Sequence, residues 1–209
     1  MKNNSLFIVF EGIDGAGTTT QATLLKEWLI SKGYNVHLTA EPSDNFIGNT
    51  IRQILRKRIV PSQDSLKSEI DHKTIALLFA ADRLDHIQNE IAPLLKDKYI
   101  VISDRYAISS IVYQGQYTRD DSWIKEINKY ALNPDITFFI DIDGKVAFDR
   151  ISKRELALEI FEKQDQLIKL SKKYREIVKE EKNIVKIDGT LEINEIFNMI
   201  KKKIEFNFL

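Results

Sequence analysis

Five short apolar runs recur along the chain, and stretches with helical spacing separate them. The runs are rich in β-branched residues and cover positions 6–10, 35–39, 99–103, 136–141 and 184–187. Runs of this length are typical of buried strands. Strands that alternate with helices form a parallel sheet with helices on both faces. The pattern therefore predicts an α/β fold with a five-stranded parallel sheet.

The segments between these runs predict helices. After the first run, apolar residues at positions 22, 24, 25, 28 and 29 fall at helical spacing, which predicts a helix over 20–32. A second long helix is predicted over 75–91. The chain has no internal repeat and no linker rich in Gly, Pro or Ser. We therefore expect a single domain over residues 1–209.

Composition narrows the classes of protein that fit. The 31 basic and 31 acidic residues cancel, so no long-range attraction to nucleic acid or to an anionic membrane is expected. The chain has no cysteine, which excludes thiolate chemistry, and its three histidines are scattered. Residues 1–5 lead directly into the first strand, and no apolar stretch reaches about 18 residues. We expect a cytoplasmic protein with neither a signal peptide nor a membrane span.

The loop at 12–19 carries the clearest chemical signal. Its sequence, Gly-Ile-Asp-Gly-Ala-Gly-Thr-Thr, matches the phosphate-binding pattern G-x-x-x-x-G-K-[ST] except that Thr18 stands at the lysine position. Glycines let backbone N–H groups turn toward phosphate oxygens, and the N-terminus of the following helix adds partial positive charge. Thr19 supplies the hydroxyl that holds Mg²⁺ in such loops. The simpler alternative is a tight turn between a strand and a helix.

Two further segments suggest a second binding site beside this loop. The run at 99–103 ends in Asp104 and Arg105, a carboxylate suited to Mg²⁺ and a guanidinium suited to a second phosphate. Phe79 and Arg83 are four residues apart, so they share one face of the helix at 75–91. A ring and a pair of donors are what recognition of a nucleobase requires. The alternatives are a surface Asp–Arg pair, a core phenylalanine and a solvated arginine.

Together these segments resemble the thymidylate kinase family. The resemblance is carried by residues 10–17, 41–52, 78–83 and 104–115, and more weakly by 150–162 and 187–190. It implies a P-loop NTPase fold with a short helical lid at approximately 144–163. It also implies transfer of the γ-phosphate of ATP to thymidine monophosphate (dTMP), with Mg²⁺ as the cofactor. Members of the family are usually homodimers, so a homodimer is expected.

The resemblance also implies roles for individual residues. The implied ATP-binding residues are Gly12, Asp14, Gly15, Ala16, Gly17, Thr18, Thr19, Thr20 and Arg150. The implied dTMP-binding residues are Asp14, Arg52, Phe79, Arg83, Arg105, Ser110, Tyr113 and Gln114. In this set Arg105 holds the phosphate, Phe79 stacks on thymine and Arg83 bonds its O4 atom. The implied catalytic residues are Asp14, Asp104, Arg105, Arg150 and Arg154, and the implied metal ligands are Thr19 and Asp104.

Two positions depart from the family pattern. Ala40 stands where many members carry arginine, and Thr18 replaces the lysine of the loop. Loss of that cation weakens the stabilisation of the transferring phosphate. Arg150, Lys153 and Arg154 share roughly one helical face in the lid segment, and their charge is available to compensate. The alternative is that these three residues form a solvated surface.

We therefore carry two hypotheses of different classes. The first is an ATP- and Mg²⁺-dependent thymidylate kinase. The second is a P-loop nucleotide-binding protein that has lost turnover and has a regulatory or partner role; only Thr18 supports it. A GTPase switch is disfavoured, because Asn-Lys-Tyr-Ala at 128–131 lacks the aspartate of the guanine-binding signature.

Overall fold

The five predicted strands form one parallel sheet. The computed structural model describes residues 5–56, 58, 70–153 and 160–208. The strands are β1 (Leu6–Glu11), β2 (Val36–Ala40), β3 (Ile100–Asp104), β4 (Ile136–Asp141) and β5 (Ile184–Asp188). Their order across the sheet is β2-β3-β1-β4-β5, and every pair is parallel. The prediction of an α/β fold with a five-stranded parallel sheet is confirmed, with strand ends shifted by at most one residue.

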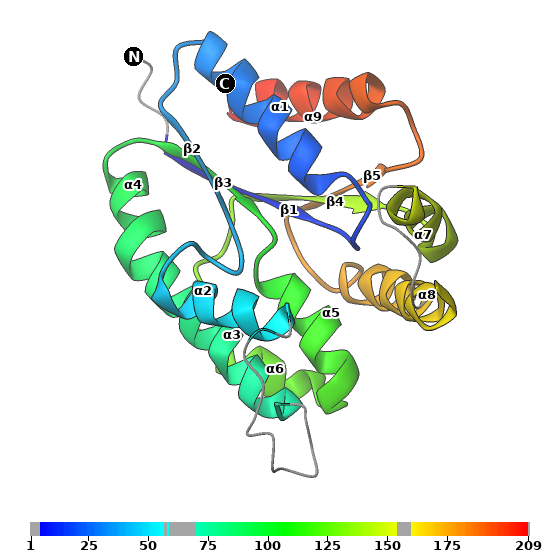
Figure 1. The fold of residues 1–209 in the computed structure, drawn as a ribbon. Coiled ribbons are helices and arrows are strands. Elements are labelled where there is room, and N and C mark those ends of the chain that lie inside the picture. Colours follow the sequence, from blue (N-terminus) through cyan, green and yellow to red (C-terminus); the bar gives the residue numbers. More distant parts are fainter. Residues whose placement is uncertain (1–4, 57, 59–69, 154–159, 209) are drawn as a thin grey trace.

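Helices cover both faces of this sheet (Figure 1). The helices are α1 (Thr18–Ser31), α2 (Phe46–Leu55), α3 (His72–His86), α4 (Ala92–Lys96), α5 (Ala107–Thr118), α6 (Asp121–Ile127), α7 (Gly144–Ser152), α8 (Ile160–Ile177) and α9 (Ile193–Phe208). Helices α1 and α9 pack together on one face, while α3, α4, α5 and α8 lie on the other. Among the described residues, no helix combines the length and the apolar character that a membrane span requires.

The helix predicted over 75–91 is longer and less regular than expected. Helix α3 begins at His72, because the carboxylate of Asp71 accepts a hydrogen bond of 2.9 Å from the backbone N–H of Thr74 and caps the first turn. Residues Ile87–Ile91 then form a π-helical turn, η1, before α4 begins at Ala92. Apolar periodicity does not reveal either feature, since a cap and a π-turn depend on local hydrogen bonds.

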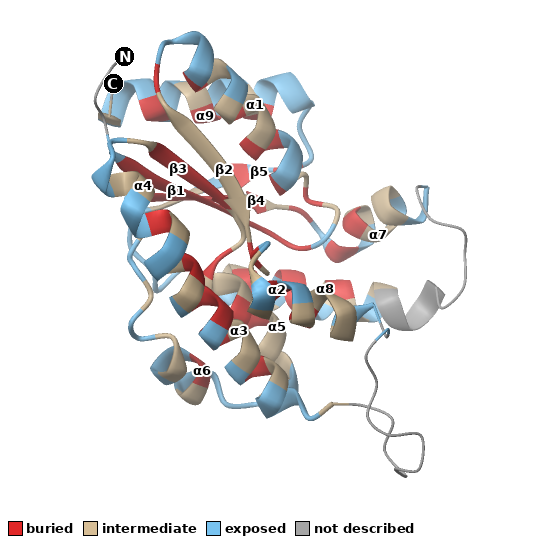
Figure 2. Ribbon diagram, turned by 60° about the vertical axis from the view of Figure 1, so that its left-hand side comes forward, coloured by how far each residue is buried: buried red, intermediate tan, exposed pale blue. Residues whose placement is uncertain are grey.

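The core lies where β1 and β3 are covered on both sides (Figure 2). All six residues of β1 are buried, which explains why its sequence is continuously apolar up to Glu11. In the parallel register Phe10 pairs with Asp104, and Ala40 pairs with the same residue from the other side. The carboxyl ends of β2, β3 and β1 are therefore level. Their following loops meet at one edge of the sheet.

Candidate active site

The glycine loop occupies the carboxyl end of β1. Gly15 has a φ of 82° and Gly17 a φ of 97°, backbone conformations that disfavour side chains. A Cβ atom at Gly12 would lie 2.9 Å from the carbonyl oxygen of Ile140 on the neighbouring strand. Gly17 is the residue before α1, so the free N–H groups of the first helical turn face the loop. This arrangement of strand, loop and helix suits the binding of phosphate oxygens.

Thr19 and Asp104 form a pair of oxygen donors beside the loop. The hydroxyl of Thr19 donates a hydrogen bond to Oδ2 of Asp104. The other carboxylate oxygen, Oδ1, is buried and has no hydrogen-bond partner among the described residues. A hard cation such as Mg²⁺ binds hydroxyl and carboxylate oxygens, so the residues present fit that ion. Nowhere in the described residues do three His, Asp or Glu side chains gather as a metal cluster.

Arg105 lies against the loop rather than pairing with its neighbour Asp104. Its Nη1 donates to the carbonyl of Gly12 at 2.9 Å, and its Nη2 donates to Oδ1 of Asp14 at 2.6 Å. The ring of Tyr113 lies 5.1 Å from the guanidinium carbon. Burial raises the pKa of Tyr113 to about 12, so its hydroxyl stays neutral and accepts a hydrogen bond from the N–H of Asp14. The alternative of a simple Asp104–Arg105 surface pair is excluded, because the ion-pair partner of Arg105 is Asp14.

Glu11 holds this region together, a role that we did not assign from the sequence. Its carboxylate accepts hydrogen bonds from the N–H of Tyr106 at 2.9 Å, from the hydroxyl of Ser109 at 2.6 Å and from the hydroxyl of Tyr174 at 2.9 Å. It thereby joins β1 to the start of α5 and to α8. Burial raises the pKa of Glu11 to about 7, although these hydrogen bonds and Arg105 oppose the shift. In the sequence, the signal for this role is a carboxylate at the end of an otherwise apolar strand, because a buried carboxylate needs hydrogen-bond partners.

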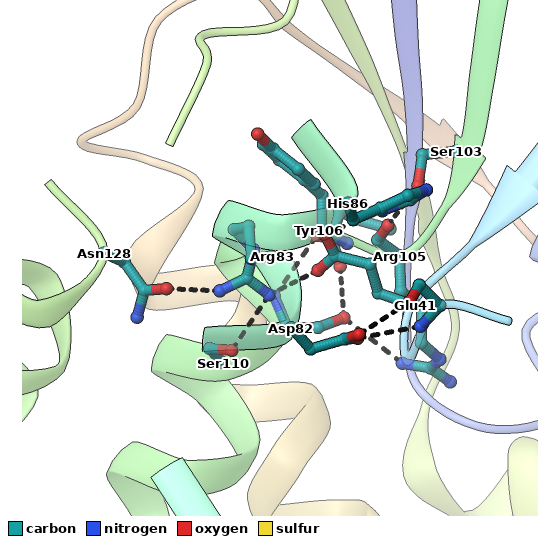
Figure 3. A network of polar contacts seen from close by, with 12 residues as sticks. Glu41, Asp82, Arg83, His86, Ser103, Arg105, Tyr106, Ser110 and Asn128 are labelled. Carbon is teal, nitrogen blue, oxygen red and sulfur yellow. Dashed lines mark hydrogen bonds and ion pairs between the residues drawn. The ribbon is translucent and has the colours of Figure 1, made fainter. Parts of the chain in front are cut away.

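Arg83 lies in a second, deeper part of the site (Figure 3). Only 1% of its surface is exposed, so the alternative of a solvated arginine is excluded. Its Nη2 donates to Oε2 of Glu41 at 2.5 Å and to the hydroxyl of Ser110 at 3.1 Å, while its Nη1 donates to Asn128. Its Nε is buried without a hydrogen-bond partner among the described residues. We had assigned no role to Glu41 or Asn128.

The remaining residues of the predicted base pocket lie around this arginine. Ser110 contacts it directly, and Gln114 lies one turn further along α5 with a buried side-chain oxygen that lacks a partner among the described residues. Phe79 is half-buried on α3, one turn before Arg83. Unsatisfied polar atoms on two helices leave hydrogen-bonding capacity for a polar ligand.

Arg52 and Asp82 fix the loop that carries Glu41. The carboxylate of Asp82 accepts hydrogen bonds from the N–H of Ser43 at 2.8 Å and from its hydroxyl at 2.6 Å. Arg52 donates to the carbonyl of Ser43 and to the carboxylate of Asp44. The guanidinium of Arg52 therefore holds the loop after β2, and its contact with a phosphate stays a prediction.

Arg150 connects the glycine loop to the loop after β5. Its Nη2 donates to the carbonyl of Gly189 at 2.8 Å, and its Nη1 donates to the carbonyl of Gly15 at 3.4 Å. Lys153 is exposed at the end of α7. The other predicted cation, Arg154, lies outside the described residues, as does part of the lid predicted at 144–163.

The fold and the glycine loop define a P-loop nucleotide-binding protein. The family model described as "Thymidylate kinase" matches residues 10–200, and the chain belongs to the thymidylate kinase family. A probable thymidylate kinase of Methanocaldococcus jannaschii is 43% identical over 94% of this chain and 94% of its own length. One of Staphylothermus marinus is 38% identical over 96% of this chain and 95% of its own length.

Proposed function

We propose that the protein is an ATP-dependent thymidylate kinase that converts dTMP and ATP into dTDP and ADP. The observation that carries the proposal is the pairing of two sites on one edge of the sheet. Arg105 adjoins the glycine loop, and the buried Arg83 of α3 donates to Ser110 on α5. This spacing suits a nucleoside monophosphate whose phosphate faces the loop and whose base reaches Arg83. The family membership and the names of the relatives support the same activity.

In this proposal each group of residues has one task. Residues 12–20 bind the ATP phosphates through backbone N–H groups, and Arg105 and Asp14 orient the acceptor phosphate. Phe79 stacks on thymine, Arg83, Ser110 and Gln114 contact its polar edge, and Tyr113 packs against the sugar. An oxygen of the dTMP phosphate attacks the γ-phosphorus in line, forming one P–O bond as the bond to the β-phosphate oxygen breaks. Catalysis then rests mainly on positioning and on charge stabilisation.

Thr19 and Asp104 are the residues that would hold Mg²⁺. The bound ion would neutralise negative charge on the ATP phosphates. The buried, unpartnered Oδ1 of Asp104 supports this assignment. Phosphate oxygens and water would supply the other ligands.

Thr18 is proposed to stand in place of the lysine of the P-loop. It is the first residue of α1 and is buried. Arg150 is proposed to supply part of the missing charge, because its guanidinium contacts the loop at Gly15. The same guanidinium contacts Gly189, near the expected position of the adenine base.

We also propose that residues 1–209 form one kinase domain and that two copies associate through α3. Leu77 and Leu84 on this helix are 51% and 42% exposed and lie seven residues apart, hence on one face. Exposed leucines in such a row favour burial against a second copy. Location in the cytoplasm stays a prediction from the sequence.

A coupled assay of ADP release tests the proposed function. With ATP and Mg²⁺ present, dTMP should support the fastest turnover, dUMP a slower one and dCMP little, because a donor aimed at O4 meets the amine of cytosine. ATP binding without ADP release for any monophosphate would instead support the nucleotide-binding alternative. Equal rates with dCMP and dTMP would contradict the assigned base specificity.

A further inference from the structure

Beyond the base pocket, His86 lies near Glu41, the residue that follows β2 (Figure 3). Nδ1 of His86 lies 3.4 Å from Oε1 of Glu41, the carboxylate whose other oxygen binds Arg83. Nε2 of His86 lies 2.8 Å from the hydroxyl of Thr39 and 3.5 Å from the carboxylate of Glu90. His86 has no exposed surface. The imidazole is therefore enclosed, with an oxygen partner at each ring nitrogen.

The charged groups around His86 favour its protonated form. Asp82 on α3, Glu41 after β2 and Glu90 on η1 are acidic, while Arg83 pairs with Glu41 and His37 on β2 lies 2.8 Å from Glu90. Tyr106 adds only a neutral hydroxyl, because burial raises its pKa well above the ordinary value. Burial lowers the pKa of His86, but the hydrogen bond with Glu41 and the charges of Glu41, Glu90 and Asp82 outweigh it and raise the pKa above 6.5. A cationic His86 donates from Nδ1 to Glu41 and from Nε2 to the hydroxyl of Thr39, and its charge attracts the carboxylate of Glu90.

The local backbone is unusual at this point as well. His86 is the last residue of α3, and Glu90 lies within the π-helical turn Ile87–Ile91. Isolated π-turns inside helices occur frequently at functional sites. Here the turn carries the carboxylate that contacts both His86 and His37.

We propose that cationic His86 is a positioning residue for the acceptor base, because it fixes the carboxylate of Glu41 that orients Arg83. This inference rests on the proposed function, in which Arg83 contacts thymine. His86 does not touch the substrate. Loss of its proton removes the positive charge that strengthens the contact with Glu41, so that carboxylate is held less firmly and orients Arg83 less well.

The alternative is a buried histidine that only stabilises the fold. The two accounts differ in what a substitution changes. A structural role alters the melting temperature and the amount of active protein. A positioning role raises the KM for dTMP, leaves the KM for ATP unchanged, and changes the pH dependence of the reaction.

Substitution at position 86 separates charge from hydrogen bonding. His86→Gln cannot become cationic and places its amide toward the Thr39 side, so the KM for dTMP should rise about tenfold, the effect of losing a charge-assisted hydrogen bond. His86→Asn places a neutral donor near the former Nδ1 and should recover part of that affinity. The matched control is His72→Gln, an exposed histidine at the start of the same helix, which should behave as the wild type.

The pH profile gives the second readout. In the wild-type protein, kcat/KM for dTMP should fall as the pH rises through the pKa of His86, above 6.5. Both position-86 variants should lack that fall. The chain has three histidines, so NMR spectra of the wild type and of single variants at positions 37 and 72 assign the His86 resonance even if His86→Gln does not fold.

The outcomes distinguish the two proposals. A His86 resonance that titrates in step with kcat/KM, together with a raised KM in His86→Gln, supports the inference. A His86 that is neutral throughout the active pH range, or a folded His86→Gln with the wild-type KM and pH profile, overturns it. Failure of the wild-type protein to phosphorylate dTMP would instead contradict the proposed function.

Discussion

At the scale of single residues, the proposed acceptor site contains two arginines whose guanidinium groups are held by other residues of the chain. Arg105 has a φ of 73° and is held by the carbonyl of Gly12 and by Asp14. Arg83 is held by Glu41, Ser110 and Asn128. Fixed guanidinium groups lose little conformational entropy on binding, and they accept planar, polar ligands in one orientation.

Thr18→Lys should raise kcat about tenfold or more, because a cation near the transferring phosphate lowers the barrier and about 1.4 kcal/mol suffices for tenfold. The glycines and Thr19 remain in place, so the loop needs no rebuilding. Steady-state kinetics at saturating ATP and dTMP measure the effect. Thr18→Ala removes the hydroxyl without adding charge and should give no gain. A lysine variant that binds ATP yet gains nothing would show that other cations already fill this role.

Glu11→Gln should change the pH dependence of stability. Folded Glu11 keeps its proton up to a pH of about 7, whereas an unfolded glutamate releases it near 4.5. Between these values the folded state binds more protons, so the free energy of unfolding declines as the pH rises, by about 3 kcal/mol in total. Glutamine does not titrate and should lack this decline. Urea unfolding of the wild type and of Glu11→Gln at pH 5 and pH 7.5 measures the free energy of unfolding. An equal change between the two pH values in both proteins would refute the raised pKa of Glu11.

At the scale of elements, the hydrophobic pattern predicted the positions of the strands but not the side-chain contacts between distant segments. The five apolar runs coincide with the five strands, and burial makes the central strands β1, β3 and β4 the most apolar of them. Asp104 and Arg105 were found as site candidates because parallel strands end at one edge. The Glu41–Arg83 and Glu11–Tyr174 contacts span 42 and 163 residues. They depend on strand order, which the hydrophobic pattern does not encode.

The sequence also left two alternative environments for some residues. From the sequence, Arg83 was either a ligand for a base or a solvated residue, and Phe79 was either a ring for stacking or part of the core. Burial of Arg83 at 1% exposure removes the solvated alternative. The half-buried position of Phe79 is compatible with both of its alternatives. Only the packing of α3 against α5 separates such cases.

Helix α7 should contribute to catalysis through Arg150. Arg150→Ala removes a cation that contacts the glycine loop, so kcat and kcat/KM should fall together, by about 10²-fold or more. When Arg150→Ala is combined with Thr18→Lys, kcat should fall by a smaller factor than it does in the wild-type background. Two cations that act on one phosphate share the stabilisation. Lys145→Ala, an exposed cation on the same helix, is the matched control and should have little effect. Strict additivity of the two changes would show that Arg150 acts elsewhere.

At the scale of the whole molecule, the exposed row on α3 predicts a dimer. Light scattering after gel filtration should give a mass about twice the 24.2 kDa of the chain. Leu84→Glu places a charge in the row and should shift the protein toward the monomer. Phe206→Glu, on α9 at the opposite face of the sheet, is the control because Phe206 is more exposed than Leu84. A monomeric wild type, or a Leu84→Glu variant that remains dimeric, would contradict this interface.

The most direct test of the account is a competition among acceptors. ATP, Mg²⁺ and equal amounts of dTMP, dUMP and dCMP are mixed with the wild-type protein, and chromatography identifies each nucleoside diphosphate formed. We expect dTDP to form first, with dUDP behind it and dCDP far below both, because the proposed contact with Arg83 requires an oxygen at position 4 of the base. Equal yields of dCDP and dTDP, or release of ADP and phosphate without any nucleoside diphosphate, would contradict it.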